Sequence, residues 1–431
     1  MTNRVLGVVL MMASVLLGQY TFHGVAVPPN EDRAWVVAFD TVAVFRTTDW
    51  GQNWEPQNLS TIRALFDVFF LDSQQGWTCG MAGDVWHTSN GGDDWARQNL
   101  GGPKQGSRVR FLNDQRGWVA GGDPVQLRTT DGGSTWEMVI LPTPPFRFDS
   151  TEFQGVWLVD EQNVWLAAGR YPIADSWTAG QGYIAHSTDF GESWQLVRRD
   201  TACDFFDIHF VDAQTGWVVG GDDRNMRAVV LHTTDGGVTW SEQSVPPAAR
   251  YLRGLCFVSP TKGWACGRNG TIIHTSDGGQ TWVRQPTFVD TTFFDIEFAD
   301  SLRGMAAGNS LVLRTTDGGE TWARCFGGVE GDGPVFRAAR PTLTASPNPA
   351  RDRVRFSPVQ ADNRVFSGRI LIHSADGRLI RALDSGRRNS DLVWDGRDAA
   401  GNPAGAGVYL ACPSESGRAA ATRFVLLGRE N

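Results

Sequence analysis

A nine-residue motif ending in tryptophan recurs along this 431-residue chain and constrains the fold more than any other feature. Its copies, here called boxes, are RTTDWGQNW (46–54), HTSNGGDDW (87–95), RTTDGGSTW (128–136), HSTDFGESW (186–194), HTTDGGVTW (232–240), HTSDGGQTW (274–282) and RTTDGGETW (314–322). Their tryptophans are spaced 41, 41, 58, 46, 42 and 40 residues apart. Repeats with periods of about 20 to 50 residues mark stacked supersecondary units. The sequence therefore predicts seven similar units.

A second motif lies between the boxes. It joins an apolar stretch, a polar turn and a Gly-Trp pair that opens another short apolar run. Clear copies occur at 68–80, 109–121, 208–220 and 255–267, and weaker copies at 25–38, 156–169 and 296–308. Each unit then reads as four short strands separated by turns, the composition of one propeller blade. We predict an all-β fold in which residues 22–326 form a seven-bladed β-propeller.

The polar residues of the box suit a turn better than a catalytic site. Ser/Thr and Asp side chains bind backbone N–H groups, Gly adopts positive φ, and Trp fills the space between neighbouring sheets. Because each unit supplies one set, these residues are expected to be structural: Asp49, Asn90, Asp131, Asp189, Asp235, Asp277, Asp317, Trp54, Trp95, Trp136, Trp194, Trp240, Trp282 and Trp322. The same spacing separates the box histidines His87, His186, His232 and His274, so we expect no metal and no cofactor.

The two ends of the chain differ from the repeat. Arg4 precedes an apolar run over 5–17, which indicates a signal peptide over 1–21 and export. No later stretch is long enough to span a membrane. After a Gly-rich linker (327–344), short alternating strands with Asp-Gly and Gly-Asn-Pro turns predict a small Ig-like β-sandwich over 345–431.

Charge and cysteine content limit the partners. The formal net charge of -8 argues against nucleic acid, because phosphate contacts need a dense field of Lys and Arg. We expect a monomer. The six cysteines form no C-x-x-C pair. Cys256 and Cys266 are the best disulfide candidates, since they could face each other across a hairpin, and two buried free thiols are the alternative.

Function is expected where the repeat is interrupted. The 58-residue gap holds two insertions, 140–153 and 170–183, which the strand order places on one face. Their aromatic and Arg residues suit a protein or glycan partner: Phe146, Arg147, Phe148, Arg170, Tyr171 and Trp177. The alternative is that they only pack the loops. The strand order places further arginines on this face: Arg63, Arg108, Arg198, Arg199, Arg224, Arg227, Arg250 and Arg253.

The boxes resemble the Asp-box, or BNR repeat, of sialidases. That resemblance implies an Arg-Ile-Pro motif and a Tyr nucleophile activated by Glu. The chain has no Arg-Ile-Pro, and Tyr251, between Arg250 and Arg253, has no assignable Glu partner. We therefore expect a non-enzymatic binding protein, with a sialidase-like or other glycoside hydrolase as the alternative.

Two further resemblances carry expectations. The Gly-Trp strand followed by HTTDGGVTW or HTSDGGQTW, at 216–240 and 263–282, is similar to the photosystem II stability and assembly factor family. This likeness over about 22–325 implies a seven-bladed propeller and offers an assembly chaperone as a third function. SPNPARDRVRF (346–356) and WDGRDAAGNPAGAGVY (394–409) resemble the C-terminal sorting domain of the type IX secretion system. They imply that residues 345–431 engage that machinery and that the protein is secreted or on the outer cell surface. An ordinary Ig-like accessory module is the alternative.

Overall fold

The computed structural model describes residues 20–29, 31–39, 43–57, 59, 64–98, 105–122, 125–142, 151–170, 181–222, 225, 227–327, 343–346, 350, 353–358, 369–374, 379–384, 391–413 and 422–427. These residues form an all-β structure with one 3-10 turn, η2 (Met81–Gly83). None of the described helices has the length and apolar character that crossing a bilayer requires. Apart from residues 283–288, which are grouped with the C-terminal part, the chain divides into two compact units near residue 335.

The first unit contains seven four-stranded sheets, each made from four strands consecutive in the chain. The first strands are β1 (Phe22–Ala26), β5 (Leu65–Phe70), β9 (Gly106–Phe111), β13 (Thr151–Leu158), β17 (Cys203–Phe210), β21 (Leu252–Phe257) and β25 (Phe293–Phe298). The second strands are β2 (Ala34–Ala38), β6 (Gly76–Gly80), β10 (Gly117–Gly121), β14 (Val164–Arg170), β18 (Gly216–Asp222), β22 (Gly263–Gly267) and β26 (Gly304–Gly308).

The third and fourth strands complete each sheet. The third strands lead into the boxes: β3 (Ala43–Thr47), β7 (Val85–Thr88), β11 (Val125–Thr129), β15 (Gly182–Ser187), β19 (Arg227–Thr233), β23 (Ile272–Thr275) and β27 (Leu311–Thr315). The fourth strands follow the box tryptophans: β4 (Glu55–Gln57), β8 (Ala96–Gln98), β12 (Glu137–Ile140), β16 (Gln195–Asp200), β20 (Ser241–Glu242), β24 (Val283–Arg284) and β28 (Ala323–Gly327).

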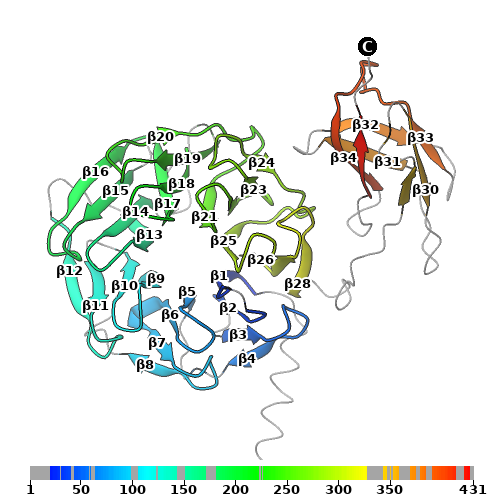
Figure 1. Cartoon of the computed structure of the whole chain (residues 1–431). Helices are drawn as coiled ribbons and strands as arrows, with labels where there is room; N and C mark the ends of the chain where they lie inside the picture. The colour runs from blue at the N-terminus through cyan, green and yellow to red at the C-terminus, as the bar shows by residue number, and fades with distance from the viewer. Residues whose placement is uncertain are drawn as a thin grey trace, which may run out of the picture. The chain divides into compact units, whose positions relative to one another are not determined.

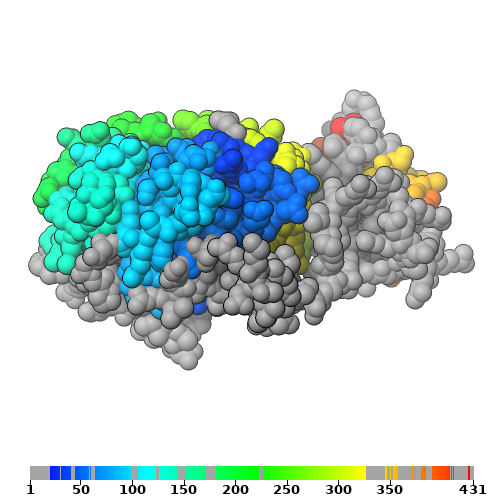
Figure 2. All heavy atoms as spheres, turned by 90° about the horizontal axis from the view of Figure 1, so that it is seen from below, coloured from blue at the N-terminus to red at the C-terminus, as the bar shows by residue number. Residues whose placement is uncertain are grey.

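The sheets surround a common axis, with the first strand of each sheet innermost (Figure 1). Sheet seven meets sheet one, because β1 packs against β25 and β26. The Val25 amide donates to Asp295 Oδ2 at 3.0 Å, and Trp54 Nε1 donates to the Cys325 carbonyl at 3.0 Å. Figure 2 shows the same neighbours on one flank, where the yellow part of the chain adjoins the blue part. The ring is thus closed by direct contacts between its first and last sheets.

Neighbouring sheets pack through the Gly-Trp motif. The buried Trp35 ring stacks on Phe70 of the next sheet at 3.6 Å between centroids, and Trp77 stacks on Phe111 in the same way. The glycine before Trp77 leaves room for the Phe70 ring of its own sheet, since a Cβ at Gly76 would lie 2.4 Å from that ring, whereas the first sheet has Ala34 at this position. The motif therefore encodes an aromatic contact between sheets as well as a strand.

All seven boxes form the same hydrogen-bonded turn. In the fifth box the Thr233 hydroxyl accepts from the Gly237 amide at 2.9 Å and donates to Asp235 Oδ1 at 2.7 Å. Asp235 Oδ1 in turn accepts from the Thr239 amide at 2.9 Å. Equivalent bonds to the Ser/Thr and Asp/Asn side chains occur in the other boxes. The box tryptophans Trp95, Trp136, Trp240, Trp282 and Trp322 meet first-strand phenylalanines edge-on.

The second unit holds two further antiparallel sheets. One contains β29 (Leu343–Ser346), β30 (Val354–Pro358) and β33 (Leu392–Trp394). The other contains β31 (Arg369–Ser374), β32 (Leu379–Asp384), β34 (Gly407–Pro413) and β35 (Thr422–Leu426). Residues from both sheets, including Phe356, Ile372, Trp394 and Leu426, share one buried core. The described part of this unit therefore has a core separate from that of the ring.

The cysteines described in the structure are free thiols: Cys79, Cys203, Cys256, Cys266 and Cys325. Cys266 lies opposite Gly254 in the β21–β22 ladder, whereas Cys256 lies opposite Trp264. The two thiols of the candidate disulfide are thus out of register with each other. Of the two alternatives for Cys256 and Cys266, the structure has two buried free thiols and no disulfide between them.

Candidate functional site: the axial mouth

Every innermost strand carries one residue that the neighbouring strand skips. In β5, for example, the pairing register shifts between Leu65 and Asp67, which leaves Phe66 as a bulge. β-Bulges redirect a side chain away from the regular pleat. The seven bulge residues are His23, Phe66, Ser107, Gln154, Phe206, Arg253 and Phe294. All of them line one cavity, here called the mouth pocket.

The mouth pocket lies where the innermost strands begin, on the face opposite the boxes. We call this the upstream face. The cavity has a volume of about 80 Å³ and is completed by Gln105, Arg108 and Glu152. The His23 ring stacks on Phe294 at 4.3 Å. The Arg253 guanidinium lies 5.1 Å from the Phe206 ring and 5.5 Å from the Phe294 ring. The pocket therefore combines aromatic faces with a cationic group.

The residues that follow the seven bulges form a layer beneath this pocket, here called the floor, and Arg108 among them also lines the pocket. From sheet one to sheet seven, the residues of the floor are Gly24, Asp67, Arg108, Gly155, Asp207, Gly254 and Asp295. Arg108 is 5% exposed, and its guanidinium lies 2.9 Å from Asp207, 2.9 Å from Asp295 and 3.5 Å from Asp67. One cation from sheet three thus binds carboxylates of sheets two, five and seven.

Each of these carboxylates also binds the next sheet. Asp67 accepts the Val109 amide at 2.8 Å, and Asp207 accepts the Leu255 amide at 3.0 Å. The glycines make room for them: a Cβ at Gly155 would lie 2.9 Å from the Asp207 Cα. Because these aspartates are buried and bonded to backbone, they tie sheets together instead of facing a substrate.

A third layer lies below the floor. Arg110 contacts Asp67 at 2.9 Å and Glu297 at 3.5 Å, and Trp157 stacks on His209 at 3.9 Å. Burial, with the repulsion of Arg110 as a second cause, lowers the pKa of His209 to about 3. The two axial arginines face four carboxyl groups (Asp67, Asp207, Asp295 and Glu297), a formal balance of -2. Burial raises the pKa of Asp207 to about 6, against the attraction of Arg108.

The predicted binding residues fall outside the part of the chain that the structure describes. Phe146, Arg147, Phe148, Tyr171 and Trp177 are all beyond it, and only the backbone of Arg170 is described. Their prediction therefore stays open. The flanking residues do reach the upstream face.

Glu152, near the end of the first insertion, and Gln154, just after it, line the mouth pocket. The Gln181 amide, at the end of the second insertion, donates to Asp204 Oδ1 at 3.0 Å. The described ends of both insertions are therefore fixed close to the sheets that form the mouth pocket.

The structure places Arg108, Arg253 and Tyr251, also expected on this face, in different surroundings. Arg108 is part of the buried floor, and Arg253 lines the mouth. Tyr251 is 3% exposed, and its hydroxyl donates to Asp204 Oδ2 at 3.3 Å, while Arg268 lies 4.5 Å from its ring. This burial gives the Tyr251 hydroxyl no open path to a sugar, so the residue is positioned as a packing element.

Sequence reasoning placed Arg108 and Arg253 on this face, but it missed the bulges themselves, the other six bulge residues and the buried axial carboxylates. A signal for the charges was present, because Asp67, Asp207 and Asp295 occupy one register position inside otherwise apolar strands. A charge in a predicted core strand points to a buried ion pair. No common residue type marks the bulges.

Fold and mouth together define a β-propeller of the BNR type with an axial pocket. Comparison with known proteins agrees: the family described as photosynthesis system II assembly factor YCF48 matches residues 46–151 and 186–287. A photosystem II assembly lipoprotein Ycf48 from Prochlorococcus marinus (strain NATL2A) is 35% identical over 66 residues, which are 15% of this chain and 18% of that protein. The aligned segment thus spans less than a fifth of that relative.

Solved structures show the same fold. A YCF48 bound to D1 peptide has a TM-score of 0.53 at 19% identity, over 70% of this chain and 95% of that one. YCF48 from Cyanidioschyzon merolae has a TM-score of 0.53 at 18% identity, over 70% and 96%. A streptogramin B lyase has a TM-score of 0.54 at 12% identity, over 69% and 94%. The ring is therefore a BNR-like propeller that resembles the photosystem II assembly factor.

Proposed function

We propose that this protein is a non-enzymatic, exported seven-bladed propeller whose axial mouth holds a side chain of a protein partner. The observation that carries the proposal is the convergence of seven bulge residues on one pocket. A cavity of about 80 Å³ is far below the roughly 300–1,000 Å³ of small-molecule sites. It suits one inserted side chain, with the surrounding upstream face contacting the rest of the partner.

The lining chemistry narrows that side chain. The half-buried His23 and Phe294 offer ring faces, and Arg253, which lies over the buried Phe206 ring, adds a cation beside them. A partner that presents an aromatic or aliphatic group next to a carboxylate would match both the ring faces and the Arg253 cation. The neighbouring propeller structure described as YCF48 bound to D1 peptide supports a peptide ligand for this fold. The 140–153 and 170–183 insertions, with Arg147 and Trp177, would extend the contact.

Two alternatives remain in view. A glycoside hydrolase needs two carboxyl groups roughly 5 to 9.5 Å apart across a substrate. Among the described mouth residues Glu152 is the one carboxylate, and the aspartates of the floor belong to the buried ion pairs. An assembly chaperone is favoured by the match to the photosystem II assembly factor family. It is compatible with the mouth as a peptide site.

The second unit is proposed as an Ig-like sorting domain that engages the type IX secretion machinery. Its two sheets share one core, and the Tyr409 hydroxyl donates to the Gly405 carbonyl four residues upstream. This bond is similar to the tyrosine corner of Ig-like sandwiches. Removal of residues 345–431 is expected to leave the chain inside the producing cell, and fractionation of cells and medium tests this.

The binding proposal is tested by selecting a random peptide library on the full chain. The Phe294→Ala and Arg253→Ala variants serve for counter-selection. We expect the enriched peptides to lose about tenfold or more in affinity for either variant, because each change removes a central contact. Val238→Ala, 81% exposed in a box turn, is the control and should bind normally. Equal peptide binding by all variants would contradict a site in the mouth pocket. Loss of binding confined to Trp177→Ala and Arg147→Ala would place the site in the insertions.

A further inference from the structure

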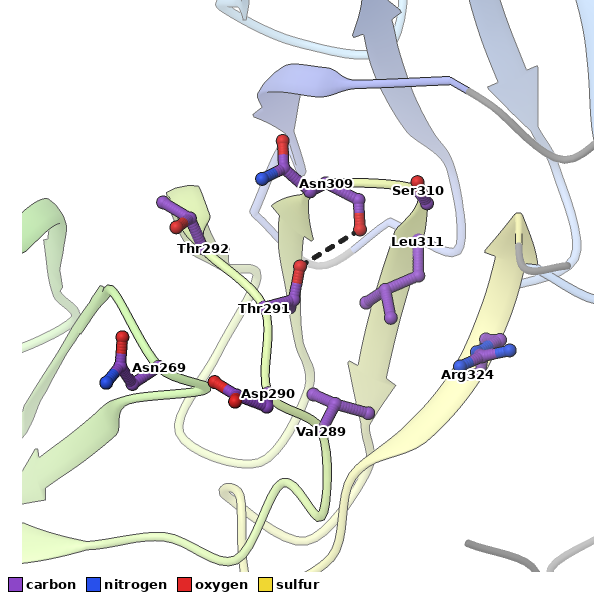
Figure 3. A pocket seen from close by; sticks show the side chains of 9 residues that line it. All are labelled: Asn269, Val289, Asp290, Thr291, Thr292, Asn309, Ser310, Leu311 and Arg324. Atoms are coloured by element: carbon purple, nitrogen blue, oxygen red, sulfur yellow. Dashed lines mark hydrogen bonds between the residues drawn. The ribbon is translucent and has the colours of Figure 1, made fainter. Parts of the chain in front are cut away.

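A larger hollow lies on the upstream face between sheets six and seven (Figure 3). Its volume is about 560 Å³, inside the rough 300–1,000 Å³ range of small-molecule sites. It shares no lining residue with the mouth pocket. Three chain segments build it: the β22–β23 turn, the β24–β25 loop and the β26–β27 turn with the start of β27 and β28.

Backbone hydrogen bonds hold these segments together. The Gly270 amide donates to the Thr291 carbonyl at 2.6 Å, and the Asn309 amide donates to the Thr292 carbonyl at 3.0 Å. The Thr291 hydroxyl donates to the Asn309 carbonyl at 3.1 Å (Figure 3). The walls are thus fixed to each other by the ring itself, so the hollow does not depend on a loop closing over it.

The lining is polar for the most part and includes an aliphatic surface. In Figure 3, Asn269, Asp290 and Thr292 lie on one side and Leu311, which is 5% exposed, lies on the other, next to Asn309. Amide and hydroxyl groups both donate and accept hydrogen bonds. Sugar hydroxyls do the same, and the C–H groups of a sugar ring can cover an aliphatic surface.

The charge of the hollow selects among polar ligands. Asp290 contributes one negative charge and Arg324 one positive charge, so the lining is formally neutral. An anionic ligand would meet the Asp290 carboxylate, and a cationic ligand would meet the Arg324 guanidinium. A neutral ligand is repelled by neither of these two charges.

We propose that this hollow is a binding site for a neutral oligosaccharide. The inference is independent of the mouth pocket, since the two sites have separate residues. It gives the upstream face two recognition elements, one for a side chain of a protein and one for a glycan.

The test measures binding of soluble neutral oligosaccharides (gluco-, manno- and galacto-series) to the full chain by calorimetry. Acidic oligosaccharides with sialic or uronic acid are run in parallel. Asp290→Asn should weaken neutral-sugar binding about tenfold or more, because a charged acceptor is lost. Thr292→Val keeps the shape, removes one hydroxyl and should weaken it by about three- to tenfold.

Two controls separate this site from the rest of the protein. Asp114→Asn, in an exposed turn of the box face, and Phe294→Ala, in the mouth pocket, should both bind sugars normally. Absence of binding at millimolar concentrations, preference for acidic sugars, or equal affinity in Asp290→Asn and the unaltered chain would each overturn the proposal. Peptide capture at the mouth is measured on the same variants, so loss of one binding activity is distinguished from loss of the other.

Discussion

At the residue scale, Glu297 is the axial carboxyl group with the clearest effect on pH dependence. Burial raises its pKa from the ordinary value of 4.5 to about 8, against the attraction of Arg110. The folded protein keeps a proton there that the unfolded chain has released across that pH window. Because the unfolded state binds fewer protons, stability falls as the pH rises through the window and levels off above it.

Glu297→Gln removes this titration. Relative to the unaltered protein, the variant should gain stability on the order of 1 kcal/mol or more between roughly pH 5 and pH 8. Urea unfolding midpoints across that range measure the difference. Glu161→Gln, whose parent side chain is 68% exposed, is the control. Parallel stability curves for Glu297→Gln and the unaltered protein would contradict a raised pKa in the folded state.

At the scale of the element, the box turn depends on one buried hydroxyl. Thr233 is 2% exposed and serves both the Gly237 amide and Asp235. Thr233→Val keeps the shape but leaves a buried N–H group without its acceptor, so it should destabilise the fold by about 1–3 kcal/mol. Thr234→Val in the same box is the matched control, because Thr234 is exposed. Chemical denaturation of both variants checks this, and equal midpoints would show that the hydroxyl is not needed.

The elements also show what the sequence could reveal. The box and the Gly-Trp pair are recognisable because each needs particular residue types: a hydroxyl at Thr233, and a glycine at Gly76 under a Phe ring. The bulge cannot be recognised in the sequence, because the backbone pairing sets it. Side chains as different as Phe66 in one sheet and Arg253 in another occupy it. The mouth pocket therefore could not be predicted from residue types, although the aspartates beneath it carry a readable signal.

At the scale of the whole molecule, Arg108 connects sheet three to carboxylates from sheets on other sides of the ring. Arg108→Met would leave buried negative charges without their shared cation, so we expect a loss of about 3–5 kcal/mol. The loss should appear in the unfolding of all seven sheets and not in one sheet alone.

Hydrogen exchange read sheet by sheet, together with thermal unfolding, checks that outcome. The control is Arg116→Met, which removes a pair at 4.0 Å with a 68% exposed Glu161, an exposed hydrogen bond to the Glu161 carbonyl and a contact with the Phe190 ring, and should cost about 1 kcal/mol. Weakened protection confined to sheet three in Arg108→Met would mean that the axial ion pairs act locally.

The bulges separate the choice of ligand from the stability of the ring. A bulge residue stands outside the strand pairing, so at the six bulges whose side chains are half-buried its identity is free to vary while the aspartates and glycines beneath it keep the sheets together. A library that randomises these six positions and keeps the buried Phe206 should retain a folded scaffold in most of its members. New binding specificities would then arise by recombining side chains within a frame that already exists.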